Sequence, residues 1–230
     1  MKKLLLALFT LAATIGSASA QVEIGLKISP SITSLRAEST SKNSFASDGS
    51  QLGFSGGLVV DYFFGENYAF STGLELAGKG GTVRYTDYLN NGGGNGNAFQ
   101  TSYKMSTQYL QLPLSVKLFT NEIAPATRLY FQVGGSLNVP IGTRINGGKF
   151  YTDPGTATEN KAGDYVYFFD ADALVAAGAE YTLGKSTKLF AGLGYHRGLV
   201  DIDHYFESKR GFSDVTIKNS SFGLDLGVKF

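Results

Sequence analysis

Apolar and polar residues alternate along most of the chain after residue 20. Alternation with a period of two predicts a β-strand with one apolar and one polar face. Each alternating segment is at least as long as the roughly 9–11 residues with which a tilted strand crosses a bilayer, whereas strands of soluble domains have about 5–6 residues. The pattern predicts eight membrane-spanning strands, at about 22–36, 51–65, 67–84, 104–119, 127–142, 165–183, 187–202 and 220–230.

The connections between these strands alternate in length. Short connections are expected at 65–67, 120–126 and 184–186, and long polar ones at 36–50, 90–97, 146–164 and 204–219. Short turns on one side and long loops on the other are typical of outer-membrane barrels. We therefore predict an all-β fold, an eight-stranded antiparallel up-and-down transmembrane β-barrel with short periplasmic turns and long extracellular loops.

The polar face of the predicted strands carries charges of both signs. In a membrane barrel this face lines the lumen and the apolar face contacts lipid, whereas a soluble sandwich reverses the two. Near balance of charge suits a closed, side-chain-filled lumen in which the charges pair. The predicted lumen charge network comprises Glu23, Lys27, Asp61, Glu75, Lys79, Lys117, Arg128, Asp170, Asp172, Glu180, Lys188, Asp225 and Lys229.

Small and aromatic residues fit the same assignment. Inward glycines would leave room for long side chains across a narrow barrel, and these are Gly53, Gly57, Gly192, Gly194, Gly223 and Gly227. Outward aromatics near strand ends predict two interfacial girdles. One girdle would contain Tyr62, Phe64, Tyr68, Phe70, Tyr181 and Phe230, and the other Tyr165, Tyr167 and Phe222.

The first 20 residues predict a secretory signal peptide that is cleaved from the mature chain. Two lysines precede an apolar stretch, and Ala18-Ser19-Ala20 forms an A-x-A cleavage site that leaves Gln21 first. The barrel domain would then span 21–230. Removing the two lysines changes the formal net charge from +1 to −1, so nothing in the charge balance implies a nucleic-acid partner. The chain has no cysteine, which excludes disulfides and cysteine-ligated metal, and no cofactor is expected.

Several segments resemble one known family. They are the export signal followed by Gln21, "GLKISPSIT" at 25–33, "YLQLPLSVK" at 109–117 and "GLDLGVKF" at 223–230. Together they resemble the PorT-like outer membrane β-barrel family of Bacteroidetes-type Gram-negative bacteria, over the whole mature chain. The resemblance implies an outer-membrane location but no single activity. It also implies that the barrel-assembly machinery contacts Leu224, Leu226, Val228 and Phe230.

Three groups of residues have candidate chemistry. Asp201, Asp203 and His204 at a strand end could activate water at the barrel rim, but no matching half-site appears elsewhere and a polar surface loop explains them. The inward His196 is better explained as a hydrogen-bonding lumen residue than as a catalytic base. Asp170 and Asp172 share a face and could bind a cation, but pairing with lumen lysines or Arg128 is the better interpretation.

The segment "YLQLPLSVKLF" places Pro113 in the middle of a predicted strand. A proline cannot donate to a sheet ladder and is usually found at edges or bulges. Since a closed barrel has no edge, we predict a local bulge, or a lumen side chain or water that serves the orphaned carbonyl.

The sequence favours a small, non-enzymatic barrel in the outer membrane of a Gram-negative bacterium, with a structural role or a role in loop-mediated surface binding or adhesion. The alternatives are a rim enzyme acting on surface lipid or peptide, and a component of a secretion or transport system. Expected partners are outer-membrane lipid and lipopolysaccharide, the barrel-assembly machinery during biogenesis, and an unidentified surface or secretion-system protein.

Overall fold

The computed structural model describes residues 21–39, 45–87, 99–152, 158–184, 186–210, 212 and 214–230. The predicted signal peptide at 1–20 and the glycine-rich loop at 90–97 lie outside the described residues. Within the described part, no helix is long and apolar enough to cross a membrane.

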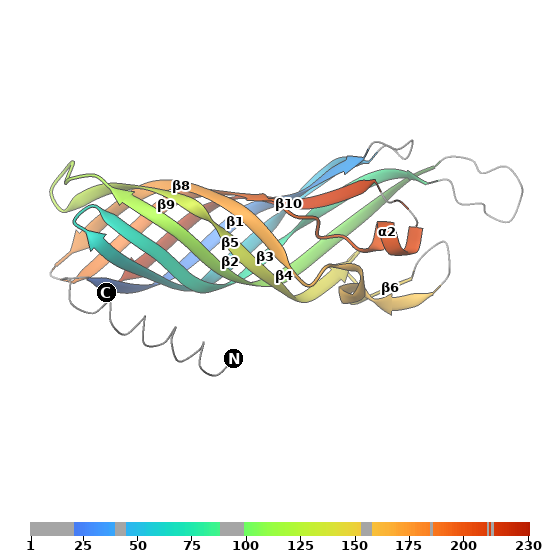
Figure 1. The fold of residues 1–230 in the computed structure, drawn as a ribbon, viewed down its shortest axis with the longest axis horizontal. Coiled ribbons are helices and arrows are strands. Elements are labelled where there is room, and N and C mark those ends of the chain that lie inside the picture. The colour runs from blue at the N-terminus through green and yellow to red at the C-terminus, as the bar shows by residue number, and fades with distance from the viewer. Residues whose placement is uncertain are drawn as a thin grey trace, which may run out of the picture.

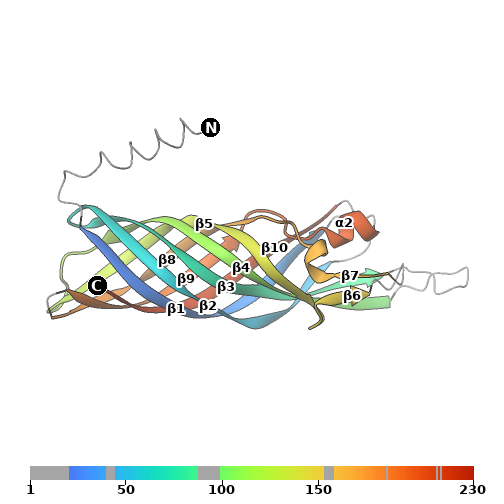
Figure 2. The same ribbon diagram turned by 90° about the horizontal axis from the view of Figure 1, so that it is seen from below.

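Eight long strands form a closed antiparallel barrel (Figures 1 and 2). Around the barrel they follow the order β1-β10-β9-β8-β5-β4-β3-β2. The predicted eight-stranded up-and-down barrel is therefore confirmed. The elements are β1 (Val22–Ser39), β2 (Ala46–Gly65), β3 (Tyr68–Asp87), β4 (Phe99–Phe119), β5 (Thr127–Ile145), β6 (Phe150–Thr152), β7 (Glu159–Lys161), the 3₁₀ helix η1 (Ala162–Tyr165), β8 (Asp170–Leu183), β9 (Thr187–Gly198), α2 (Tyr205–Arg210) and β10 (Val215–Lys229).

The two faces of the wall are as the alternation predicts. Outward leucines such as Leu26, Leu74 and Leu193 are about half exposed, while polar side chains of the opposite parity are buried. An apolar outer belt and a polar interior suit a wall surrounded by lipid. The two chain ends that the structure describes, β1 and the end of β10, lie together at the short-turn end (Figure 1).

One of the two predicted aromatic girdles is present. At the short-turn end Phe64, Tyr68, Tyr181 and Phe230 are 47–64% exposed, as side chains at a membrane interface are. The prediction for the opposite end is wrong for Tyr165. This residue is only 1% exposed, because it belongs to η1 and turns into the barrel mouth rather than outward.

Element boundaries differ from the prediction mainly at the long-loop end. The expected strand at 165–183 begins only at Asp170, because the chain before it forms η1 and an irregular segment. The expected strand at 187–202 ends at Gly198. The expected loops at 146–164 and 204–219 contain ordered structure, namely the β6–β7 hairpin in the first and α2 with the start of β10 in the second.

Pro113 lies inside the wall without the predicted bulge. It is buried on the lumen face and pairs with Ser136 of β5 in an unchanged register. On its other side the β3–β4 pairing lapses over residues 73–74 and resumes in the same register. The missing backbone N–H of proline removes β3–β4 pairs from the ladder but adds no residue to either strand. Only an added residue would shift the register. The carbonyl of Pro113 accepts a hydrogen bond from the hydroxyl of Thr72 on the outer side, at 2.9 Å.

Candidate functional site

A lysine ammonium occupies the centre of the lumen in its short-turn half. The Nζ of Lys229 (β10) lies 2.9 Å from Glu23 Oε2 (β1) and 2.9 Å from Asp61 Oδ2 (β2), and it also contacts Glu180 (β8). These carboxylates offer ligand atoms within 4.8 Å of one another, which is a spacing that could hold a metal ion. The ammonium already lies among these carboxylates, and further lysines and an arginine pair with them, so we assign no metal to this position.

Three further basic residues complete this half of the network. Lys117 Nζ is 3.0 Å from both carboxylate oxygens of Asp61, and Arg128 donates to Glu180 at 3.0 Å. Lys188 contacts Glu23 and lies 3.5 Å from Glu180. Each carboxylate therefore meets at least two cations, which is the pairing that buried charges require.

Asp172 is the hub of the other half of the lumen. It accepts hydrogen bonds from Lys79 Nζ at 2.7 Å, Ser136 Oγ at 2.5 Å and Asn138 Nδ2 at 2.9 Å. His196 donates from Nδ1 at 2.8 Å, so this histidine is a lumen hydrogen-bonding residue, as predicted. With its oxygens occupied by these donors, Asp172 is not arranged as a cation ligand.

The remaining predicted lumen charges are also inside. Lys27 lies 2.8 Å from Glu75 and 3.9 Å from Asp225. Asp170 differs from the prediction, because its hydrogen bond comes from the Asn219 amide at 2.9 Å rather than from a lysine or Arg128. Strand stagger places Asn219 opposite this carboxylate, which the sequence alone does not show.

An aromatic cluster closes the lumen at the short-turn end. This short-turn cluster consists of the inward-facing side chains Val59, Phe63, Ala69, Phe119, Tyr130 and Phe190. The charge network lies against it, since Arg128 sits 4.7 Å above the Phe119 ring and Lys117 5.5 Å from the Tyr130 ring. Such cation–π contacts add to the stability of buried cations.

A larger apolar cluster closes the opposite end. This mouth cluster consists of Leu35, Val83, Tyr85, Tyr103, Met105, Ile145, Ala162, Tyr165, Val166, Ile202, Tyr205, Phe206, Val215 and Ile217. Its inward wall residues meet residues from η1 and α2. The Tyr205 ring stacks on Tyr103 with centroids 5.4 Å apart, and Phe206 meets Tyr85 edge-on at 4.9 Å. The polar middle of the lumen is thus enclosed between two apolar clusters.

The rim residues Asp201, Asp203 and His204 make separate contacts. Asp201 accepts the backbone N–H groups of Asp203 and Ile217, at 3.1 and 2.8 Å. Asp203 accepts the N–H of Phe206 at 2.9 Å, which caps the start of α2. The His204 ring instead lies against Tyr167, with centroids 4.9 Å apart. Both carboxylates therefore hold the loop in place.

Burial has a strong effect on the acidity of Asp203. The side chain is 4% exposed among the apolar residues of the mouth. Burial, together with the neighbouring Asp201, raises the pKa of Asp203 to about 8, against the hydrogen bonds from the backbone, which lower it. The carboxyl is protonated through most of the physiological pH range below that value.

Both apolar clusters are absent from the sequence prediction, although part of the signal was present. Val83 and Tyr85 have the same parity as the inward Lys79, and Met105 has that of Lys117. Extending the alternation past the membrane-spanning length would have placed these apolar side chains inside. The contributions of η1 and α2 have no such period-two signal.

Two predicted groups remain predictions. Leu224, Leu226 and Val228 lie on the outer wall of β10, and Phe230 follows it directly. The structure does not test their contact with the assembly machinery. The cleavage residues Ala18 and Ala20 lie outside the described part of the chain.

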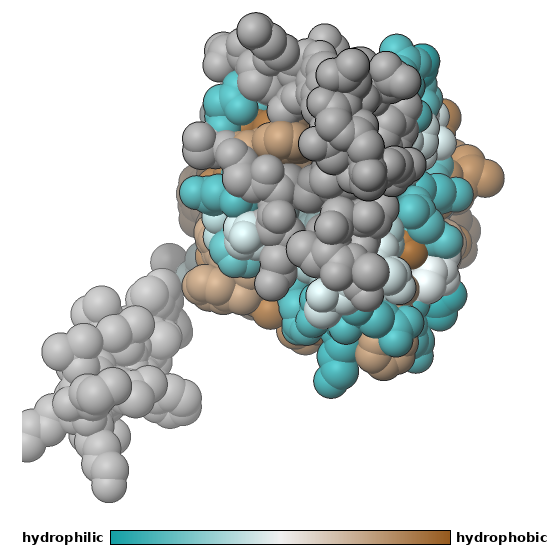
Figure 3. Space-filling model, turned by 90° about the vertical axis from the view of Figure 1, so that its right-hand side faces the viewer, coloured by the Kyte–Doolittle hydropathy of each residue, from teal (hydrophilic) through white to brown (hydrophobic). Residues whose placement is uncertain are grey.

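Seen from the long-loop end, the described rim is largely hydrophilic, with separate apolar patches (Figure 3).

Comparisons with known structures return other membrane barrels. Neisserial surface protein A (NspA) is 15% identical, with 92% of this chain and 98% of that one covered and a TM-score of 0.46. OprG from Pseudomonas aeruginosa is 12% identical, with 92% and 97% covered and a TM-score of 0.47. Ail of Yersinia pestis is 13% identical, with 91% and 99% covered and a TM-score of 0.36. No curated protein sequence matches significantly.

Family membership rests on the sequence match and agrees with the fold described above. Residues 16–204 match the model of the outer membrane protein beta-barrel domain, which is most of the chain. The apolar belt, the closed wall and the paired lumen charges are what such a domain requires. The protein is located in the outer membrane of a Gram-negative bacterium. It belongs to the outer membrane protein β-barrel domain family.

Proposed function

We propose that this protein is a closed, non-enzymatic barrel of the PorT-like branch, which anchors its extracellular loops and binds partners through them. One observation carries the proposal, namely the enclosure of the charged lumen between the mouth cluster and the short-turn cluster. A lumen filled in this way leaves no continuous aqueous path, so binding is assigned to the outer surfaces. The ordered extracellular segments, including the β6–β7 hairpin and α2, supply a surface for such binding.

The rim-enzyme alternative receives no support from the geometry. Asp201 and Asp203 accept backbone N–H groups, and the His204 ring lies against Tyr167 rather than against either carboxylate. A catalytic base and acid need a shared geometry around one reacting atom, and these contacts supply none. The absence of enzymatic activity is part of the proposal.

Single-channel recording of the purified mature chain in planar bilayers tests the closed lumen. We expect a folded protein, recognised by its heat-dependent gel mobility, that gives no resolvable conductance steps. Reproducible steps from the folded protein would contradict the proposal. For the loops, replacing 150–161 by a two-residue turn should preserve folding and reduce capture of proteins from native outer membranes. Unchanged capture would remove this hairpin from the binding surface.

A further inference from the structure

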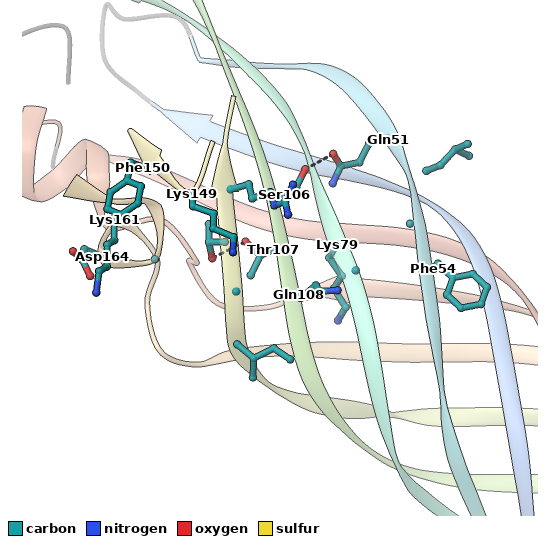
Figure 4. A pocket seen from close by; sticks show the side chains of 18 residues that line it. Gln51, Phe54, Lys79, Ser106, Thr107, Gln108, Lys149, Phe150, Lys161 and Asp164 are labelled. Carbon is teal, nitrogen blue, oxygen red and sulfur yellow. Dashed lines mark hydrogen bonds between the residues drawn. The ribbon is translucent and has the colours of Figure 1, made fainter. Parts of the chain in front are cut away.

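The outer face of the barrel is hollowed by a groove of about 820 Å³ (Figure 4). Strands β2–β5 and described residues between 149 and 164 line it, and no residue of β1, β8, β9 or β10 does. A cavity inside an eight-stranded barrel would meet strands from every side, because the interior is narrow. The groove therefore opens on the membrane side of the wall, and the buried side chains of Lys79, Thr107 and Thr143 reach it from the lumen side.

Missing side chains and an interrupted ladder create the hollow. Gly78 and Gly142 leave the outer face bare, and the atom nearest to a Cβ built on Gly142 is a side-chain oxygen 3.9 Å away. Residues 50–54 and 78–81 form no β2–β3 pairs. Gln51 crosses this interruption and accepts a hydrogen bond from the Ser106 hydroxyl at 2.7 Å, as Figure 4 shows.

The groove lies at the edge of the apolar belt that faces the long loops. Its membrane side carries Leu52, Phe54 and Ile141, which are 89, 59 and 55% exposed. Lipid headgroups meet a barrel at this boundary, where apolar outward residues give way to polar ones. A ligand bound here would have its apolar part in the bilayer and its polar part towards the loops.

The loop side of the groove is basic. Arg144, Lys149 and Lys161 line it and are exposed, and the acidic residue beside them is Asp164. Among the described residues, no carboxylate forms an ion pair with any of these three cations. In the lumen, by contrast, Lys79, Lys117 and Lys229 are all paired. The groove thus combines an apolar floor with an excess of positive charge.

We infer that this groove binds a phosphorylated glycolipid of the outer leaflet, namely the lipid A part of lipopolysaccharide. Its phosphates are bound by Arg144, Lys149 and Lys161, since a guanidinium binds phosphate through paired hydrogen bonds and an ammonium as a point charge. Its acyl chains lie along Leu52, Phe54 and Ile141. Charge complementarity and the position of the groove at the headgroup level select this ligand. The inference does not depend on the loop-mediated binding proposed above.

Titration of the purified mature chain in detergent with fluorescent bisphosphorylated lipid A tests this assignment. Dephosphorylated lipid A and phosphatidylglycerol serve as competitors. We expect the bisphosphorylated form to bind at least about tenfold more tightly than either competitor, which is the difference expected when charge-assisted hydrogen bonds are lost.

Two kinds of variant separate charge from shape. The double variant Arg144→Gln/Lys149→Gln removes cations, and Gly142→Phe fills the groove without changing any charge. Each should weaken lipid A binding about tenfold. Arg197→Gln, an exposed arginine on β9 across the barrel, and Ala177→Phe on the lipid face of β8 are the controls, and both should bind as the wild type does. Heat-dependent gel mobility confirms that every variant is folded.

Three results would overturn the inference. Equal affinity for phosphorylated and dephosphorylated lipid A would remove the role of the cations. Equal competition by phosphatidylglycerol would show a general anionic-lipid surface rather than a lipid A site. A loss in Arg197→Gln as large as in the double variant would show that overall charge, and not this groove, controls binding.

Discussion

The Nζ of Lys229 lies 2.9 Å from Oδ2 of Asp61, so that the last residue of β10 is tied to β2 across the barrel interior. The same ammonium contacts Glu23 and Glu180, and it is only 1% exposed. One cation thereby links four strands of the wall. Its removal would leave three buried carboxylates with less compensation, in a place where unpaired charge is costly.

Lys229→Met should therefore destabilise the folded barrel by about 3–5 kcal/mol, the usual effect of removing one partner of a buried ion pair. Urea titration in detergent, followed by the fraction of heat-modifiable protein, measures the loss. Lys149→Met, which replaces an exposed lysine outside the lumen, is the control and should change stability by about 0.5 kcal/mol or less. A Lys229→Met protein as stable as this control would refute the central role of the ammonium.

The extracellular cap, defined as residues 199–217 with α2, closes the barrel mouth. Asp203 should make this cap sensitive to pH. Its pKa is about 8 in the folded cap against 3.8 normally, so opening of the cap releases a proton between these values. The free energy needed to open the cap is highest below about pH 4, falls as the pH rises to about 8, and is constant above that. The protection factors of amides in 199–217, which are exchange rates corrected for the intrinsic pH dependence of amide exchange, should fall through this window.

Asp203→Asn should abolish most of that pH dependence, because an amide oxygen can still cap α2 but cannot ionise. The carboxyl of Asp201, whose pKa is also raised by burial, accounts for any remaining slope. Asp164→Asn changes an exposed carboxyl of η1. Its cap should show the same pH dependence of hydrogen exchange as the wild type. If Asp203→Asn kept the full profile, another group would be responsible.

The mouth cluster should control access to the lumen from outside. Since the chain has no cysteine, Thr107→Cys places a single reporter at a lumen position that is 3% exposed. Adding Tyr205→Ala and Phe206→Ala removes buried aromatic packing and should raise the rate of thiol labelling about tenfold or more. Phe168→Ala, an aromatic residue 81% exposed, should leave the rate unchanged, and equal rates in all three proteins would contradict a closed mouth.

The alternation of apolar and polar residues is sufficient to predict the barrel, because odd or even position along a strand decides which face each side chain occupies. It correctly placed Lys229 and Asp172 inside the wall. It could not show that Lys229 would meet Glu23, Asp61 and Glu180, because such meetings depend on the stagger of strands far apart in sequence. For a related reason the sequence could not show that Asp201 and Asp203 each accept backbone N–H groups of the chain that follows them.

Pro113 illustrates the limit of single-residue rules. The sequence predicts a bulge at Pro113, or a lumen side chain or water that serves the orphaned carbonyl, whereas the β4–β5 bulge lies at Ile141, between the pairs Gln108–Gly142 and Tyr109–Pro140. A lapse of pairing accommodates the first proline, whereas an added residue accompanies the second. The residue type predicts a disturbance of the ladder, and the neighbouring strands determine its form.

The hydroxyl of Tyr130 lies 2.2 Å from the position of a Cβ built on Gly192, and the carbonyl of Ala177 lies 2.9 Å from it. Gly192→Ala should therefore destabilise the barrel by about 1–3 kcal/mol through overpacking, measured by urea titration in detergent. Gly194→Ala is a matched control on the same strand and face, where the nearest atom is 3.3 Å away on the flexible Asp225 side chain, and it should cost less.

Rescue distinguishes this steric cause from a general intolerance of alanine in β9. Tyr130→Ala removes the clashing ring, so Gly192→Ala should cost less in that background than in the wild type. The coupling free energy of the double-mutant cycle should be at least about 0.5 kcal/mol, as for residues in direct contact. Additive effects would mean that the Ala177 carbonyl or the backbone of β9, rather than the Tyr130 ring, requires glycine at this position.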